Sequence, residues 1–395
     1  MLVKILCVFG KHQYGDPSRG FGVEYVSFIP ALKKLGHEVH HFDSWNRATY
    51  ADLAQLNARL LETVEALQPE VMLVVHMEYE VWIETLEIIS ARGDVATVSW
   101  AADDSWKYRE VSRFVGRAYH AMTTTFKPAV AQYREDGISR ILLTQWGVPD
   151  EWVSEPLPSA ECKYEVSFVG AAHGNRLAWV DRLRANGIEV ACFGHGWPAG
   201  SVSAESIPQI MRRSIISLNF ANSKGVNQIK ARTFEVPGCG GFLMTECAPG
   251  LEDFYRPGRE IEVFQDLAEL VAKIRYYLSH PEERDEIAWA GFSRTRSEHR
   301  YSDRMRTVLE HALQAREAAS GEIAAKPFAQ ALASHRLSLP LKAVRNVTLR
   351  AGCLIFGPTR GLRAARRLVF ELSWRLVGRH TFTAAGWPGR MFPEC

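Results

Sequence analysis

The sequence lacks several patterns that would indicate a function directly. It has no run of about 18 apolar residues of the kind that spans a membrane, and no C-x-x-C pair that would indicate a zinc ribbon or a thioredoxin-type site. Neither the dinucleotide fingerprint G-x-G-x-x-G nor the phosphate-binding motif G-x-x-x-x-G-K-S/T occurs. No D-x-D triplet and no His/Cys ligand cluster is present, so we expect neither a bound metal nor a cofactor.

Signals for export are also missing. The seven cysteines are odd in number and scattered, and several lie in apolar runs where a small buried side chain is the expected role. The first apolar run, Leu2–Phe9, is interrupted by Lys4 and is too short for a signal peptide. We therefore expect a cytoplasmic protein with reduced thiols.

Length and composition describe an ordinary globular chain of about two domains, with 395 residues, 47% of them hydrophobic and 23% charged. The charge is distributed unevenly. From Ala331 onward there are eleven basic and two acidic residues, a local charge of +9, which leaves 36 basic against 43 acidic residues (−7) in the rest. This pattern predicts an acidic body with a basic tail.

Short apolar strands alternate with helical segments along the first part of the chain. A strand over Val3–Phe9 leads into a glycine-containing loop and a helix over Val23–Leu35. Further strands are expected at 37–42, 71–75, 97–100, 121–124 and 141–143, with helical segments between them. Such alternation is typical of a parallel α/β sheet.

The same pattern starts again after the proline-containing link Val153–Ser159. A strand over Tyr164–Val169, a loop and a helix repeat the opening arrangement, and more strands follow at 190–193, 215–219 and 242–245. We therefore expect two Rossmann-like domains, at residues 1–155 and 156–316, with a linker and helical basic tail at 317–395. A ligand would bind in the cleft that the carboxyl ends of both sheets face.

Two segments of the first domain should reach this cleft. The loop FGKHQYGDPSRGFG would carry His12, Tyr14 and Arg19 there, unless it is only a mobile surface loop. Asp103 and Asp104 follow a strand in SWAADDSWKY and should lie at the same edge of the sheet. Adjacent carboxylates at a helix start also serve as a cap, so both roles stay open for this pair.

The stretch ANSKGVNQIKARTFEVPGCGGFLMTE, residues 221–246, is the most informative part of the second domain. It indicates a helix carrying Lys230, Arg232 and Glu235, followed by a glycine-rich turn. The carboxylate is suited to accept hydrogen bonds from the two hydroxyls of a ribose, and the two cations are suited to bind a diphosphate. Spacing alone equally allows an exposed helix with internal salt bridges.

Several blocks of the sequence together resemble one family. FEVPGCGGFLMTE, GLEDFYRPGREIEVF, IRYYLSHPEERDEIAWAGFSR and EHRYSDRM look like the carboxyl half of the CgeB-like group-1 glycosyltransferases. YEVSFVGAAHGNR resembles the start of that family's second domain, and AADDSW and QWGVPDEWV resemble landmarks of its first. The resemblance covers residues 1–312, is strongest at 164–305, and leaves the tail outside.

This resemblance implies a GT-B fold and a nucleotide-sugar donor, with a UDP-sugar as first choice, held mainly by the second domain. Glu235 matches the glutamate that binds the donor ribose, and Arg176 and Lys230 match phosphate contacts. Asn227 stands where the wider superfamily often has an acidic residue that contacts the sugar. The implied donor site also includes Gly170, Arg232, Gly240 and Gly241.

The implied reaction is metal-independent transfer of the sugar to a hydroxyl of a glycan, a lipid-linked acceptor or a protein, with no nucleic acid involved. An inverting enzyme would take its base from His12, Asp103 or Asp104, whereas a retaining enzyme would use the donor phosphate. Two other functions remain open: a sugar-nucleotide epimerase, and a non-catalytic protein that binds a nucleotide sugar or a partner.

The basic tail has amphipathic segments at Leu341–Phe356 and Leu362–Val377. Three roles are open for it: packing across both domains, binding the acidic body or a partner, or lying on the inner face of an anionic membrane through residues 341–379. Under the membrane hypothesis, the protein would associate with the membrane peripherally and in a salt-sensitive way.

Overall fold

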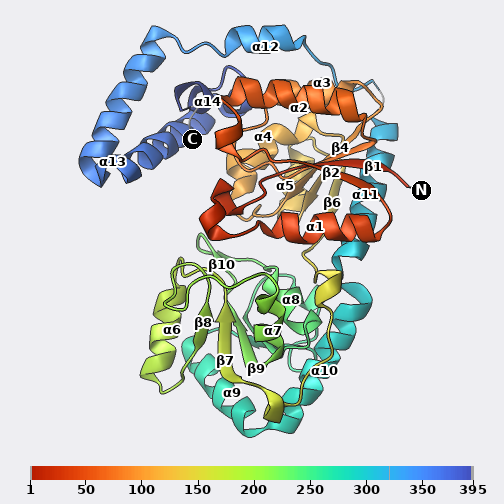
Figure 1. The fold of residues 1–395 in the computed structure, drawn as a ribbon, viewed down its shortest axis with the longest axis vertical. Coiled ribbons are helices and arrows are strands. Elements are labelled where there is room, and N and C mark those ends of the chain that lie inside the picture. Colours follow the sequence, from red (N-terminus) through yellow and green to blue (C-terminus); the bar gives the residue numbers. More distant parts are fainter. Residues whose placement is uncertain (1, 320, 393–395) are drawn as a thin grey trace.

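A computed structural model describes residues 2–319 and 321–392, and its first domain is built on a six-stranded parallel sheet (Figure 1). The order of the strands across the sheet is β2 (Glu38–Phe42), β1 (Lys4–Val8), β3 (Val71–Val74), β4 (Ala96–Ala101), β5 (Ala121–Thr124) and β6 (Ile141–Leu143). The helices between them are α1 (Val23–Lys34), α2 (Leu53–Leu67), α3 (Ile83–Ala91), the short α4 (Arg113–Val115) and α5 (Ala129–Glu135).

Both faces of this sheet are covered, which explains why its strands are uniformly apolar. Side chains alternate between the faces, so Ile5 and Cys7 of β1 pack toward α1, whereas Leu6 and Val8 pack toward α2 and α3. The expected parallel α/β sheet is confirmed.

The second domain has a five-stranded parallel sheet with the order β13 (Glu262–Phe264), β12 (Leu243–Glu246), β9 (Ser214–Asn219), β7 (Tyr164–Val169) and β8 (Ala191–Phe193). Its helices are α6 (Arg176–Ala185), α7 (Ser206–Arg212), α8 (Arg232–Gly238), α9 (Leu267–Ser279) and α10 (Pro281–Glu298), and a small hairpin is formed by β10 (Asn222–Ser223) and β11 (Val226–Asn227). The three-residue strand β13 was not expected from the sequence.

In both sheets the strand order reverses beside the first strand of the domain. The reversal lies between β1 and β3 in the first domain and between β7 and β9 in the second. In open α/β sheets, ligands bind outside the carboxyl ends of the strands at such a point. The loops that follow β1, β7 and β9 are therefore the segments that build the site.

Helix α11 (Tyr301–Ala318) returns the chain to the first domain. It packs against α1, β4 and β5, and its buried residues Met305, Val308 and Ala312 join the core on the α1 face of that sheet. In Figure 1, α10 lies beside the second domain, and α11, which follows it in the chain, lies beside the first. The second domain thus ends near residue 300 by packing, earlier than the expected boundary at 316.

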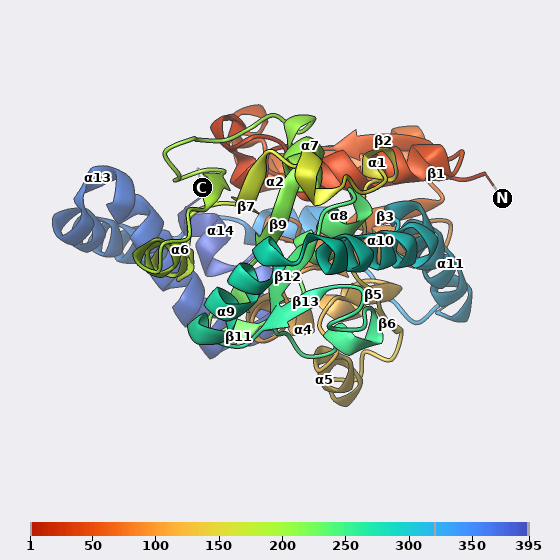
Figure 2. The ribbon, with the colours of Figure 1, turned by 90° about the horizontal axis from the view of Figure 1, so that it is seen from below.

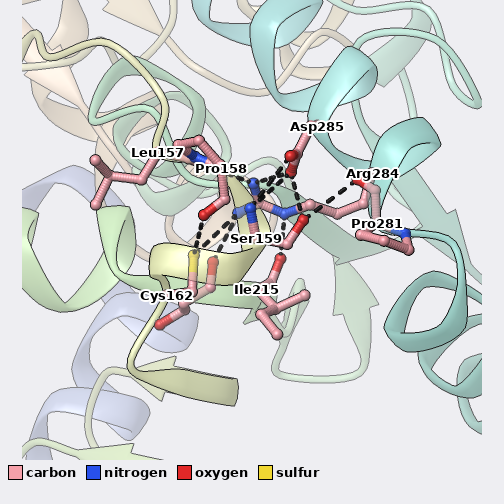
Figure 3. Close-up of polar contacts among 9 residues, drawn as sticks. Leu157, Pro158, Ser159, Cys162, Ile215, Pro281, Arg284 and Asp285 are labelled. Carbon is pink, nitrogen blue, oxygen red and sulfur yellow. Dashed lines mark hydrogen bonds and ion pairs between the residues drawn. The ribbon is translucent and has the colours of Figure 1, made fainter.

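The link between the domains is fixed to the second domain by a fully buried arginine (Figure 3). Arg284 donates hydrogen bonds to the carbonyl oxygens of Leu157 (3.1 Å), Ser214 (2.8 Å) and Ile215 (2.7 Å), and pairs with Asp285 at 2.9 Å. Asp285 in turn accepts from the Ser159 hydroxyl at 2.7 Å. A buried guanidinium is tolerated because its donors are satisfied in this way.

The tail continues from α12 (Phe328–Ser334) into α13 (Leu339–Val377) and α14 (Trp387–Met391). Helix α13 is broken at Gly357, which has φ 77°, so the two expected helical segments form the arms of a hairpin. The second arm packs on the first domain, where Phe370 is 2% exposed. Figures 1 and 2 both show α13 projecting beyond the body of the molecule. Within residues 2–319 and 321–392, no helix has both the length and the apolar composition needed to cross a membrane.

Candidate donor site between the domains

Three basic side chains of the second domain meet at the carboxyl end of β7. Arg176 opens α6 and donates from Nη1 to the carbonyl oxygen of Ala171 at 3.0 Å, while its guanidinium lies 5.3 Å from the ring centre of Phe168. Arg232 opens α8 and donates from Nε to the carbonyl oxygen of Val169, also at 3.0 Å. Lys230 lies two residues before the start of α8, so the loops after β7 and β9 bring together all three of the expected phosphate-binding cations.

The positions of these cations disfavour their charged forms. Burial lowers the pKa of Lys230, and the charge of Arg176 lowers it further, although Asp103 acts in the opposite direction. Burial likewise lowers the pKa of Arg176, and it lowers the pKa of Arg232 to about 10. A cluster of partly desolvated cations that repel one another is stabilised by a bound anion.

Glu235 lies beneath this cluster. Its side chain is 1% exposed and forms an ion pair with Arg232, three residues earlier on α8. In this state the carboxylate orients Arg232 and faces the protein rather than solvent. Its expected role as the ribose ligand stays a prediction, and it requires Arg232 to move when the donor binds.

The first domain contributes a facing wall of acidic groups. Asp103, just after β4, lies 3.7 Å from Lys230, measured from Oδ1 to Nζ, and the Asp103 side chain is 38% exposed. Glu24, in the first turn of α1, has a pKa raised by desolvation and further by the charge of Asp103. A carboxyl group with a raised pKa, within electrostatic reach of a second, partly exposed carboxylate, is an arrangement suited to proton transfer.

Asp104 points the other way. Its carboxylate is buried, accepting from the Ser112 hydroxyl at 2.7 Å and the Tyr133 hydroxyl at 2.9 Å. Burial raises its pKa, and these hydrogen bonds partly offset the rise. Both oxygens are thus engaged inside the first domain, an environment that favours a structural role for Asp104 over the expected role of a catalytic base.

The glycine-containing loop after β1 brings Tyr14 within electrostatic reach of Asp103 and Arg176. The ring of His12 stacks on Phe21 with 5.3 Å between centres. The pKa of the Tyr14 phenol is raised first by desolvation and then by Asp103, while Arg19 and Arg176 act to lower it. Tyr14 is therefore within electrostatic reach of both walls of the cleft.

Gln228 bridges the two domains and was missed by sequence reasoning. It is 1% exposed, accepts from the Ser105 hydroxyl at 2.6 Å and donates to the carbonyl oxygen of Ala102, also at 2.6 Å. Its neighbour Asn227, in β11, donates to the carbonyl oxygen of Cys247 at 2.7 Å. The donor-side loop is therefore anchored to both domains.

Glu246, at the carboxyl end of β12, is a second residue that was missed. It is 7% exposed and accepts from the backbone N–H groups of Ala221 (2.8 Å) and Asn222 (3.2 Å). Its charge acts to raise the pKa of Arg176, so it supplies part of the countercharge of the basic cluster. Only its place at the end of a parallel strand signalled this role.

The three glycines expected in the donor site divide into two groups. Gly170 lies at the end of β7, where an added Cβ would be 2.9 Å from the Phe168 ring and 3.5 Å from Arg176. Gly240 and Gly241 lie past the opposite end of α8, where a Cβ would be 2.6 Å from the Ser154 carbonyl oxygen and 2.7 Å from that of Met211, respectively. These two glycines serve close packing against the link and α7, not donor contact.

No group of three or more His, Cys, Asp or Glu side chains is arranged to hold a metal ion in the part of the chain that the structure describes. The groups that interact here are three cations, three carboxylates and a phenol, namely those of Arg176, Lys230, Arg232, Asp103, Glu24, Glu246 and Tyr14. This set suits an anionic ligand that also presents hydroxyl groups.

Comparisons with known proteins agree with this arrangement. A family model described as glycosyl transferase-like matches residues 176–310, which include the basic cluster. No curated protein matches the sequence. The structure is similar to a glycosyltransferase from Rickettsia africae with a TM-score of 0.56 and 12% identity, covering 80% of this chain and 98% of that one.

Two other solved structures are similar over about the same share of this chain. HepE of Anabaena, determined with UDP and glucose, has a TM-score of 0.56 and 13% identity, covering 81% of this chain and 100% of its own. Sucrose-phosphate synthase of Thermosynechococcus elongatus has a TM-score of 0.59 and 11% identity, with coverage of 80% and 100%. The fold is GT-B, with an added helical region at the C-terminus. The family match relates residues 176–310 to glycosyl transferase-like proteins.

Proposed function

We propose that this protein is a metal-independent glycosyltransferase that moves a sugar from a nucleoside-diphosphate sugar, with a UDP-sugar as first choice, to an acceptor hydroxyl. The observation that carries the proposal is the convergence of Arg176, Lys230 and Arg232 at the carboxyl end of β7, opposite Asp103 of the other domain. A place in the CgeB-like subgroup is part of the same proposal and rests on the sequence blocks described above.

The basic cluster suits the leaving group of this reaction. As the bond between the sugar and the diphosphate breaks, negative charge develops on the phosphate oxygens. Arg176 and Lys230 stabilise this charge beside the interdomain contacts that Gln228 makes with Ser105 and Ala102. Because these cations are already positioned, they need little reorganisation during the reaction.

The facing wall suits the acceptor. Asp103 is a partly exposed carboxylate 3.7 Å from Lys230, and its proposed role is to accept the proton of the attacking hydroxyl. Glu24 holds its proton more readily than an ordinary glutamate and lies within electrostatic reach of Asp103. Tyr14 completes this wall. The acceptor is a hydroxyl of a glycan, a lipid-linked molecule or a protein.

A thermal-shift screen with UDP-, GDP-, ADP-, CMP- and dTDP-sugars tests the donor class. We expect stabilisation by one group of nucleotide sugars that share a base, and the same stabilisation by the matching nucleoside diphosphate without sugar. Stabilisation by none of them, in a protein that melts cooperatively, would contradict the proposal.

A further inference from the structure

The first arm of the α13 hairpin and its turn form an exposed apolar surface with a basic border. Leu354, Ile355 and Phe356 occupy the turn and are 89%, 69% and 55% exposed. Val347, one or two helical turns earlier, is 68% exposed. Three successive exposed large apolar side chains are unusual on a soluble surface and mark a site of interaction.

The turn has a defined shape. An added Cβ at Gly352 would lie 2.6 Å from the Gly361 carbonyl oxygen, and one at Gly361 would collide with the backbone nitrogen of Cys353. The two arms therefore cross in close contact just behind the turn. Gly357, with φ 77°, reverses the chain before Pro358. The apolar side chains are thus presented on a closed helical hairpin.

The charge around this turn has one sign. Between Ile323 and Phe370 the sequence contains nine basic residues and no acidic residue. Four of them, Lys342, Arg350, Arg360 and Arg363, lie on the exposed parts of the hairpin and form no ion pair among the described residues. An apolar tip with a surrounding group of free cations is complementary to an anionic membrane surface.

The basic residues nearer the body are used differently. Arg366 pairs with Glu78 at 3.1 Å, Arg367 with Glu110 at 2.8 Å, and Arg379 pairs with Glu87. These contacts, together with buried Phe370, fix the second arm to the first domain. The second arm of the tail therefore docks on the acidic body, as one of the expected roles has it, and the tip stays exposed.

The hairpin also lies close to the cleft. Glu110 binds Arg367 of the tail through one oxygen and Lys224 of the β10–β11 hairpin through the other, at 3.5 Å. Lys224 Nζ lies 3.1 Å from the ring centre of Trp106, just after Asp103 and Asp104. The tail, the first domain and the donor-side loop thus meet at a single carboxylate.

We propose that the tip of the α13 hairpin, residues 354–356, inserts into the surface of an anionic membrane while Lys342, Arg350, Arg360 and Arg363 bind lipid headgroups. Association is peripheral and reversible, because three side chains and a few cations supply its free energy. Since the second arm is fixed beside the cleft, binding holds the cleft at the membrane surface. This inference stands on the tail alone and does not require the proposed transferase activity.

Vesicle flotation with the full-length protein tests the proposal. Vesicles of phosphatidylcholine alone are compared with vesicles that also contain phosphatidylglycerol, at low and at high salt. We expect binding only to the anionic vesicles, weakening as salt rises because the contacts are exposed. The triple variant Leu354→Ser/Ile355→Ser/Phe356→Ser should lose about tenfold or more in partition coefficient. Arg360→Gln and Arg363→Gln should each lose about fivefold.

A matched control replaces three apolar side chains that are exposed elsewhere, Leu143, Leu177 and Trp289, by serine. This variant should float like the wild type. The proposal is overturned if the tip variant and the wild type float equally. It is also overturned if the wild type floats with neither kind of vesicle at low salt. A wild-type dimer in sedimentation velocity that the tip variant converts to monomer overturns it as well, since the tip would then bind a second copy. Circular dichroism and melting curves of each variant show that the fold is kept.

Discussion

Lys230 of the second domain and Asp103 of the first face each other across the cleft, with 3.7 Å between Nζ and Oδ1. The pair is partly exposed, with 20% and 38% of the two side chains accessible, so it contributes little to stability. Its value is positional. It places a cation that suits the leaving diphosphate directly opposite a carboxylate that suits the acceptor hydroxyl.

The basic cluster leads to a prediction about diphosphate recognition. Lys230→Met and Arg176→Met should each weaken binding of the preferred nucleoside diphosphate by about 10- to 100-fold, because a charged hydrogen bond contributes about 1.5–3 kcal/mol. Binding of the nucleoside alone should not change. Isothermal titration of both ligands measures this, with exposed Arg182→Met as the control. An equal loss of affinity for the nucleoside and for the nucleoside diphosphate would show that the basic cluster does not recognise the diphosphate.

Glu235 permits a test that separates a direct from an indirect role. If its carboxylate binds the ribose, Glu235→Gln should reduce the preference of the protein for a ribonucleotide over the 2′-deoxynucleotide by about tenfold. If it acts only by orienting Arg232, with which it pairs, both nucleotides should lose affinity equally. Parallel titrations of the two nucleotides decide between these results, and only the first outcome supports Glu235 as a ribose ligand.

The neighbouring aspartates should behave differently when replaced. Asp103→Asn should lower kcat by about 100-fold or more and leave donor binding nearly unchanged, as expected for loss of a base. Asp104→Ala should instead lower the free energy of unfolding by about 1–3 kcal/mol, because the Ser112 and Tyr133 hydroxyls lose their acceptor. Turnover and melting curves of both variants measure this. If Asp103→Asn keeps full kcat, Glu24→Gln becomes the next variant to test on the same wall.

Chelation tests the absence of a metal from the reaction. We expect sugar transfer to continue at an unchanged rate in EDTA, because cationic side chains hold the diphosphate and no metal-binding cluster is formed by the described residues. Turnover is compared before and after chelation and after adding Mn²⁺. Complete loss in EDTA with recovery in Mn²⁺ would show that Asp103 and its neighbours hold a metal.

His299 leads to a prediction about acid stability. Its Nδ1 must accept from Arg304 at 2.9 Å, so the ring is neutral with its proton on Nε2, which donates to the Phe254 carbonyl oxygen at 3.2 Å. Burial, and then the charge of Arg304, lower its pKa to about 4. Between pH 6.5 and about 4 the unfolded chain therefore binds more protons, and the free energy of unfolding should fall as the pH falls.

The decrease in the free energy of unfolding that we assign to His299 is up to about 3 kcal/mol between pH 6.5 and about 4. Denaturation with urea at several pH values should show a shallower pH dependence in His299→Gln than in the wild type. His195→Gln, at an exposed position, should match the wild type. Identical slopes for all three proteins would show that His299 binds protons equally in the folded and unfolded states, contrary to a lowered pKa. His120, whose pKa is likewise lowered to about 4, chiefly by burial, contributes to the dependence that remains.

The sequence predicted the architecture well, since buried parallel strands appear as short apolar runs such as Val3–Phe9 and Tyr164–Val169. The strand β13 was missed because Glu260 and Glu262 interrupt its short apolar run. Helix α11 was expected in the second domain but packs on the sheet of the first, because the pattern of its apolar face does not reveal which sheet it covers.

The candidate site could be predicted only in part. The cations Arg176, Lys230 and Arg232 carry a recognisable pattern at the ends of strands, and the structure brings them together. Adjacent aspartates look alike in sequence, and only the contacts of Asp104 with Ser112 and Tyr133 distinguish it from Asp103. Gln228 carries no signal at all, because its role arises from a partner 123 residues away in the chain.

Mass spectrometry of the reaction with a panel of nucleotide sugars is the decisive experiment for the proposed function. The wild type should release the nucleoside diphosphate from one donor and transfer or hydrolyse its sugar, whereas the folded Arg176→Met/Lys230→Met variant should not. A donor that binds but is never consumed would indicate a non-catalytic binding protein. A sugar that changes its configuration while still attached to the nucleotide would indicate an epimerase, and either result would contradict glycosyl transfer in this cleft.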